Sequence, residues 1–274
     1  MSELVLIEEN EEGTISTLKL NRMNKKNAFN TELLIAFKEA IQKVGQSDTR
    51  VIIITGQEDV FSAGIDLNSL TGNDQLLNNL GYGDVKKPSN FRFYVNTFIQ
   101  PILASIEKIE KPVIARINGF CYGLAFELSL ACDFRFALDN ATISMIETKI
   151  GMNPDVGGTI RLTRIVGIAN AKDIVMTGRS FDGNEAYRLG VLNGVASNLN
   201  ELDEMIKKYA DELIDAAPLA VGLSKKLIDD LYGKDLAFGM EMETLVSSQL
   251  VQTKDFMIGA IAKLAKKKPK WKGK

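Results

Sequence analysis

The sequence contains no histidine, and this absence excludes more chemistry than any single residue that is present. Without an imidazole, a Ser-His-Asp or Cys-His nucleophile cannot be assembled. Two cysteines, Cys121 and Cys132, are too few to suggest a zinc site when histidine is absent, so no metal is expected. Acid or base catalysis near neutral pH is then left to carboxylates, lysine or tyrosine.

Excess charge and long apolar runs are also scarce. The formal net charge is -2 over 274 residues, which gives no reason to expect a nucleic-acid partner. No run reaches the roughly 18 apolar residues of a membrane span, and the first segment, MSELVLIEENEEG, is acidic, unlike a targeting presequence. Both cysteines lie in apolar surroundings, as is typical of a reducing compartment. We therefore expect a cytoplasmic protein with no membrane partner.

Apolar patterns in the first part of the chain predict strands that alternate with helices. Residues 4–9 and 14–20 alternate in polarity around the turn NEEG, which predicts a hairpin. A helix is expected from Thr31, which can cap TELLIAFKEAIQKV. The short apolar runs at 51–56 and 112–117 predict strands that are buried on both faces.

The remaining segments differ in character. Residues 71–90 are rich in glycine and asparagine and predict a surface loop or a weakly anchored helix, whereas residues 91–110 predict a helix with a kink or a break at Pro101. The last part of the sequence is amphipathic and helical throughout. We expect an α/β core over residues 1–198, followed by a helical region over residues 199–274.

Two stretches of sequence repeat one plan. VIIITGQEDVFSAGIDL and PVIARINGFCYGLAFEL each contain a buried strand, a glycine turn, and a second glycine, Gly64 or Gly123, that opens a short helix. The first amides of a helix have no partner within it and can bind an anion. Two such units side by side would form a site with two N–H donors. Alternatively, the glycines only permit tight turns.

Two glutamates stand in apolar or structured surroundings twenty residues apart. Glu127 lies within GLAFELSL, and Glu147 lies within SMIETKIG. A buried carboxylate is costly unless it is paired or its pKa shifts, so these positions are candidates for acid–base catalysis. The alternatives are that Glu127 complements a helix dipole and that Glu147 is a surface residue beside Lys149.

Together, four motifs resemble the crotonase family of enoyl-CoA hydratases and isomerases: FSAGIDL, KPVIARINGFCYGLAFELSLACD, ETKIGMNPDVGGTIRLTRIVG and IAKLAKKKPKWKGK. The resemblance runs nearly end to end. It implies an α/β fold of repeated strand–strand–helix units, with a C-terminal helical region that builds homotrimers or homohexamers. It also implies an acyl-CoA thioester substrate and no separate cofactor, because coenzyme A enters as part of that substrate.

The resemblance assigns roles to individual residues. The backbone N–H groups of Ile65 and Leu124 would form an oxyanion hole for the thioester and its enolate, although many relatives have glycine in place of this leucine. Glu127 and Glu147 would hold a water, adding its oxygen to the β-carbon and a proton to the α-carbon, which hydrates a trans-2-enoyl-CoA to a 3-hydroxyacyl-CoA. The channel for coenzyme A would be lined by Lys26, Ala28, Ala63, Gly64, Asp66, Leu67 and Gly123.

Asp155 departs from the pattern of the hydratases, which commonly have a small residue there. Dienoyl-CoA isomerases of the same family have an aspartate in a similar Asp-Val-Gly context, so Asp155 could be catalytic and shift a double bond in a dienoyl-CoA or 3-enoyl-CoA. It could instead cap a helix that begins near Gly157. The lysine-rich tail leaves a third possibility, a non-catalytic protein that binds acyl-CoA or RNA, although the net acidity favours an enzyme without a nucleic-acid partner.

Overall fold

A computed structural model describes residues 3–71 and 74–274, and in these residues the main sheet has six strands. The strands lie in the order β1-β2-β3-β5-β7-β10, and only the hairpin of β1 and β2 is antiparallel. The hairpin prediction is therefore confirmed. The strands are β1 (Val5–Glu9), β2 (Ile15–Leu20), β3 (Val51–Thr55), β5 (Val113–Ile117), β7 (Phe134–Leu138) and β10 (Gly194–Ala196).

A smaller sheet stands beside the main one, and it takes the second strand from each of three successive repeats and a further, antiparallel strand. Its described strands follow the order β4 (Val60–Ser62), β6 (Phe120–Tyr122), β8 (Ile143–Ser144) and β9 (Ser180–Phe181). The first two repeats continue into α2 (Leu67–Leu70) and α6 (Leu124–Ala131). The predicted strand–strand–helix units are therefore confirmed.

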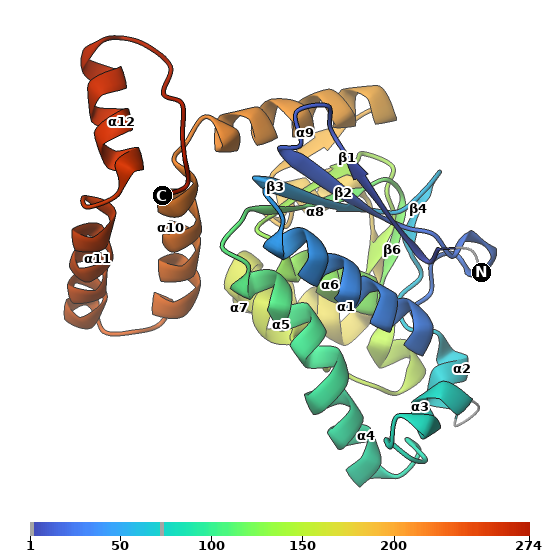
Figure 1. Cartoon of the computed structure of the whole chain (residues 1–274). Helices are drawn as coiled ribbons and strands as arrows, with labels where there is room; N and C mark the ends of the chain where they lie inside the picture. The colour runs from blue at the N-terminus through green and yellow to red at the C-terminus, as the bar shows by residue number, and fades with distance from the viewer. Residues whose placement is uncertain (1–2, 72–73) are drawn as a thin grey trace.

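Helices cover both faces of the main sheet (Figure 1). On one face, α1 (Thr31–Gln46), α5 (Gln100–Lys108) and α6 contribute to the larger apolar core. On the other face, Leu202, Ile206 and Ala210 of α9 (Leu199–Ile214) pack on the sheet. The predicted cap of α1 was wrong by one residue, since Asn30 accepts the hydrogen bond from the amide of Leu33.

The segment between α2 and α5 contains short helices, in agreement with the helix expected over residues 91–110 and with the helical alternative for residues 71–90. It contains α3 (Gln75–Asn79), α4 (Pro88–Tyr94) and a π-helical turn (Val95–Ile99). Residues 72–73 of the predicted loop lie outside the described residues. The helix is not broken at Pro101, because α4, the π-helical turn and α5 follow one another without a gap; instead the π-helical turn ends where α5 begins, and Pro101, which has no N–H, is near the start of α5.

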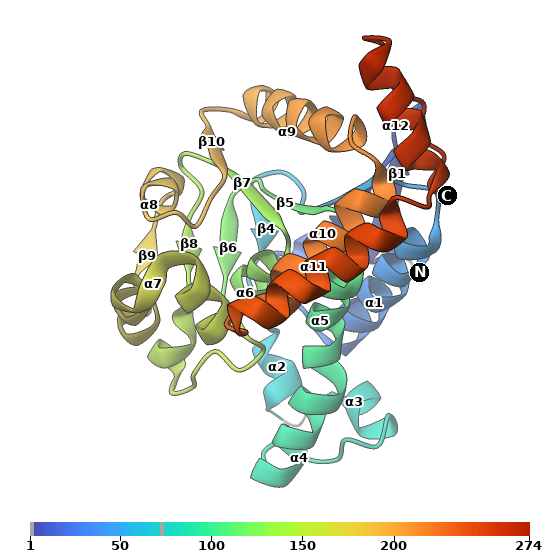
Figure 2. The same cartoon turned by 90° about the vertical axis from the view of Figure 1, so that its left-hand side faces the viewer.

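The last three helices form a separate group on one side of the core (Figures 1 and 2). They are α10 (Pro218–Leu231), α11 (Leu236–Leu250) and α12 (Lys254–Leu264), and they follow α7 (Gly158–Thr177), α8 (Gly183–Arg188) and α9. Among the described residues, no helix combines the length and hydrophobicity needed to cross a membrane. Helix α9 follows the predicted boundary between residues 198 and 199, yet it packs on the main sheet of the core. The boundary between the core and the helical region therefore stays a prediction.

Candidate active site

The amide of Ile65 is left free by the way its neighbours pair. Phe29 donates its N–H to the carbonyl of Gly64 over 2.7 Å, and its carbonyl accepts the N–H of Asp66 over 2.8 Å. In such a parallel bridge, Phe29 uses both neighbours of Ile65, so the N–H of Ile65 points away from Phe29. It makes no hydrogen bond with any described residue.

The amide of Leu124 is also unpaired among the described residues, and it lies close to the loop of Ile65. Leu124 is the first residue of α6, so its N–H has no acceptor within that helix, and it finds none elsewhere in the described chain. A Cβ on Gly64 would lie 3.3 Å from this nitrogen and 2.5 Å from the carbonyl oxygen of Tyr122, so the two loops are in contact. The side chain of Leu124 packs in the apolar core, which explains how leucine is accommodated here.

Glu127 is held rigidly in the first turn of α6. Its side chain is 2% exposed, and Oε1 accepts the amides of Val156 over 3.1 Å and Gly158 over 2.7 Å. Burial, and then the charge of Glu147, raises the pKa of Glu127 to about 8 against the effect of these amides. The helix-dipole alternative for Glu127 does not account for this burial or for the two amide bonds.

Glu147 approaches from a 3₁₀ turn (Ile146–Ile150). It is 9% exposed, and Oε1 lies 2.9 Å from where a Cβ on Gly123 would be, so this carboxylate lies against the start of α6. Oε2 is buried and accepts no hydrogen bond in the described part of the chain. Burial, with a contribution from Asp155, raises the pKa of Glu147 to about 7. The surface alternative for this residue is therefore wrong.

Asp155 does not cap the following helix. The N-cap of α7 is Gly157, at φ 101°, and it makes no side-chain capping bond. Asp155 lines a cavity of about 600 Å³ together with Phe91, Val95 and Gln100, and Gln100 donates to its carbonyl over 2.7 Å. Burial raises the pKa of Asp155, and its charge in turn raises the pKa of both glutamates. Three carboxylates thus share one region.

The residues predicted to contact coenzyme A lie on two adjoining segments. Ala63 donates its N–H to the carbonyl of Lys26 over 2.9 Å, and Ala28 lies in the segment that pairs with the loop of Ile65. The ammonium of Lys26 is 5.6 Å from the ring centre of Phe120, and the side chain of Leu67 is exposed. The structure places these residues on segments that adjoin the loop of Ile65.

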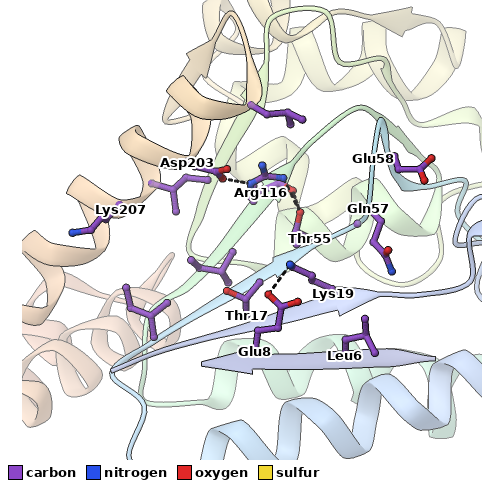
Figure 3. A pocket seen from close by; sticks show the side chains of 15 residues that line it. Leu6, Glu8, Thr17, Lys19, Thr55, Gln57, Glu58, Arg116, Asp203 and Lys207 are labelled. Atoms are coloured by element: carbon purple, nitrogen blue, oxygen red, sulfur yellow. Dashed lines mark hydrogen bonds and ion pairs between the residues drawn. The ribbon is translucent and has the colours of Figure 1, made fainter. Parts of the chain in front are cut away.

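A different cavity of about 510 Å³ lies between the main sheet and α9 (Figure 3). Two ion pairs line it, Glu8 with Lys19 at 2.6 Å and Arg116 with Asp203 at 2.6 Å. None of the residues predicted for catalysis or substrate binding lines this cavity. It is therefore separate from the candidate active site.

Comparison with known proteins agrees with this geometry. The family model for enoyl-CoA hydratase/isomerase matches residues 10–274. Enoyl-CoA hydratase domain-containing protein 2, mitochondrial, of Mus musculus is 33% identical over 268 residues, which cover 95% of this chain and 85% of the relative. The peroxisomal Delta(3,5)-Delta(2,4)-dienoyl-CoA isomerase of Arabidopsis thaliana is 30% identical over 269 residues, which cover 98% and 96%.

Solved structures give the same result for the fold. The crystal structure of enoyl-CoA hydratase from Bacillus anthracis is similar with a TM-score of 0.87 and 30% identity, covering 99% of this chain and all of that one (100%). The resemblance seen in the motifs therefore extends to the arrangement of both sheets and the helices. The chain belongs to the enoyl-CoA hydratase/isomerase family of enzymes and has the crotonase fold.

Proposed function

We propose that this enzyme catalyses the reversible hydration of a trans-2-enoyl-CoA to a 3-hydroxyacyl-CoA. One observation carries the proposal: two buried glutamates, with pKa values of about 8 and about 7, lie beside the two unpaired amides. Both the donors for an oxyanion and the acid–base pair are then in one place. The relatives include a crotonyl-CoA hydratase of Syntrophomonas wolfei, 32% identical over 268 residues.

The backbone N–H groups of Ile65 and Leu124 would donate hydrogen bonds to the thioester oxygen. Negative charge develops on this oxygen when the α-carbon exchanges a proton, and donors already fixed in place stabilise it without reorganising. Because both amides belong to backbone held by neighbouring hydrogen bonds, their direction is set by the fold. Removing one such donor typically lowers kcat by about 10² to 10³.

The two glutamates would move the protons. Between about pH 7 and pH 8 the pair carries one proton, which rests mainly on Glu127 because its pKa is the higher. Hydration would start from the arrangement in which this proton has moved to Glu147, and one pKa unit corresponds to a cost of about 1.4 kcal/mol for that transfer. Glu127, anchored through Oε1, would take a proton from water as its oxygen bonds to the β-carbon. Glu147 would give its proton to the α-carbon through the buried Oε2. Proton transfer within the pair then restores the starting state.

A second reaction, migration of a double bond, is favoured by the position of Asp155 in the adjoining cavity. The Arabidopsis relative named as a dienoyl-CoA isomerase is similar over nearly the whole chain. A third carboxylate could carry a proton further along a conjugated acyl group. This reaction would not require water to add to the substrate.

The two reactions can be separated by following absorbance with two substrates, crotonyl-CoA and a 3,5-dienoyl-CoA. We expect loss of the conjugated absorbance of crotonyl-CoA at a rate that Asp155→Asn leaves nearly unchanged. Asp155→Asn should abolish any conversion of the diene. If the wild-type enzyme converts only the diene, hydration is the wrong assignment and isomerisation replaces it.

We also propose that the enzyme works as a homotrimer or homohexamer. Helix α11 has no buried residue, and large apolar side chains are exposed along α11 and α12, including Leu236, Phe238, Met240, Leu245, Met257, Ile261 and Leu264. An apolar surface of this extent suits contact with other subunits. Sedimentation velocity would test the oligomeric state.

The cytoplasmic location stays a prediction, since relatives are named as mitochondrial or peroxisomal.

A further inference from the structure

One arginine joins the two segments that form the thioester site. Nη1 of Arg22 donates to the carbonyl of Ala28 over 2.8 Å and to Oδ2 of Asp66 over 2.8 Å. The arginine and aspartate side chains are only 16% and 10% exposed, so this ion pair is largely shielded from water. The contact spans 44 positions of sequence and fastens the segment before α1 to the loop that carries Ile65.

Asp66 follows Ile65 in the chain, so the bonds that hold Asp66 also restrain the amide of Ile65. Its own N–H donates to Phe29 over 2.8 Å, and Oδ1 caps α2 by accepting the amide of Asn68 over 3.1 Å. Although burial favours the neutral acid, the bonds from Arg22 and Asn68 hold the pKa of Asp66 below its ordinary value. The ionised aspartate therefore fixes the residue next to Ile65 from three directions.

The segment on the arginine side is conformationally demanding. Lys26 and Asn27 both adopt left-handed backbone conformations, at φ 48° and 53°, which non-glycine residues rarely do. The buried side chain of Asn27 accepts the amide of Arg22 over 2.8 Å and donates to the carbonyl of Phe61 over 3.1 Å. Such a conformation persists only where its surroundings hold it, and the arginine is part of those surroundings.

We propose that Arg22 is a positioning residue for catalysis: through Ala28 and Asp66 it fixes the direction of the Ile65 amide. The inference rests on the proposed thioester chemistry. Nη1 of its guanidinium bonds to two protein acceptors, and through these bonds Arg22 would act on the backbone. A displacement of about 1 Å can cost about 10²-fold in rate. We expect Arg22→Met to lower kcat by about 10- to 100-fold while KM changes by less than about threefold.

Arg116 offers a matched control on the far side of the main sheet (Figure 3). Its side chain is 15% exposed, about as buried as that of Arg22, and it pairs with Asp203 at 2.6 Å and donates to Thr55 over 3.3 Å, although Asp203 is more exposed than Asp66. It lines the separate cavity and none of the active site. Arg116→Met removes an equally buried guanidinium and should keep the wild-type kcat. If both variants lose kcat equally, the effect on Arg22 is general destabilisation and the proposal is wrong.

A spectroscopic probe reports on the oxyanion hole directly. We would bind 4-dimethylaminocinnamoyl-CoA, whose absorption moves to longer wavelength when two donors polarise its carbonyl. Wild type and Arg116→Met should show the shift, and Arg22→Met should lose most of it at saturating probe. A full shift in Arg22→Met would overturn the positioning role alone. No shift in the wild type would overturn the thioester site as well.

Two further variants keep the test decisive if Arg22→Met folds poorly, as judged by circular dichroism. Arg22→Lys keeps a cation opposite Asp66 and should recover part of both kcat and the spectral shift. In the double variant Arg22→Met with Asp66→Asn, the loss in kcat should not exceed that of the worse single variant, since the pair acts as one unit. Additive losses would show that Arg22 and Asp66 act independently and would contradict the proposal.

Discussion

Replacing Glu127 by glutamine should lower kcat strongly and should stabilise the fold increasingly as pH rises above about 4.5. Glutamine keeps a carbonyl oxygen that can accept the amides of Val156 and Gly158, so the local structure should survive. What disappears is a negative charge buried beside Glu147. The substitution therefore separates the cost of burying a charge from the loss of contacts.

The magnitude follows from the shifted pKa. Burial raises the pKa of Glu127 from 4.5 to about 8, and each pH unit corresponds to about 1.4 kcal/mol, so ionisation in the folded state costs at most about 5 kcal/mol. Between these two values the folded protein holds a proton that the unfolded chain releases. The free energy of unfolding of the wild type therefore falls as pH rises from about 4.5 to about 8. The glutamine variant lacks this contribution.

Urea unfolding at pH 5.5, 7.0 and 8.5 would measure the difference, at one protein concentration because subunit association adds to stability. The advantage of Glu127→Gln should grow with pH and reach about 3 to 5 kcal/mol at the highest pH, while kcat falls about 10²- to 10⁴-fold. Glu201→Gln is the control. Hydrogen bonds from Ser197 lower the pKa of the exposed Glu201, so its replacement should not stabilise. If the free energies of unfolding of Glu127→Gln and wild type differ by the same amount at all three pH values, the reasoning is refuted.

Three further predictions concern the wider molecule. The pH dependence of kcat/KM should be bell-shaped with limbs near 7 and 8, and activity that is flat from pH 6 to 9 would contradict the coupled pair. Lys225→Met should lower the free energy of unfolding by about 3 kcal/mol, because it strands the buried Asp133, which Lys225 contacts at 2.8 Å; a loss below about 1 kcal/mol would contradict this. Asp255→Ala removes the carboxylate that accepts two amides of the C-terminal tail, so emission from Trp271, the single tryptophan, should move to longer wavelength; unchanged emission would show that the tail stays docked.

The elements that the sequence predicts well are those set by short-range patterns. The apolar runs of β3 and β5 are buried as expected, and Gly56 and Gly119 mark the turns after them. A Cβ at either glycine would lie 1.8 Å from a backbone oxygen of the neighbouring segment, so the fold depends on these two residues. The cap of α1 was missed because Asn30 and Thr31 are both good capping residues.

Sequence motifs predict the two glutamates of the candidate site but not the residues that hold them in place. Glu127 and Glu147 were identified from their spacing and from the family resemblance, yet the amides that hold Glu127 belong to Val156 and Gly158, about thirty positions away. The glycine pair in DVGGT was the available signal, since glycine often marks a close backbone approach. The bond from Arg22 to Asp66 spans 44 positions and leaves no local pattern that sequence reasoning could use.

The same glycines that shape the site also set its acidity. A Cβ on Gly158 would lie 2.6 Å from Oε1 of Glu127, and one on Gly123 would lie 2.9 Å from Oε1 of Glu147. Because glycine has no Cβ, the main chain at both positions can enclose the carboxylates and exclude water. This enclosure raises the pKa values of both glutamates toward neutrality. In a chain without histidine, this enclosure is what gives a carboxylate the proton affinity that general acid–base catalysis needs at neutral pH.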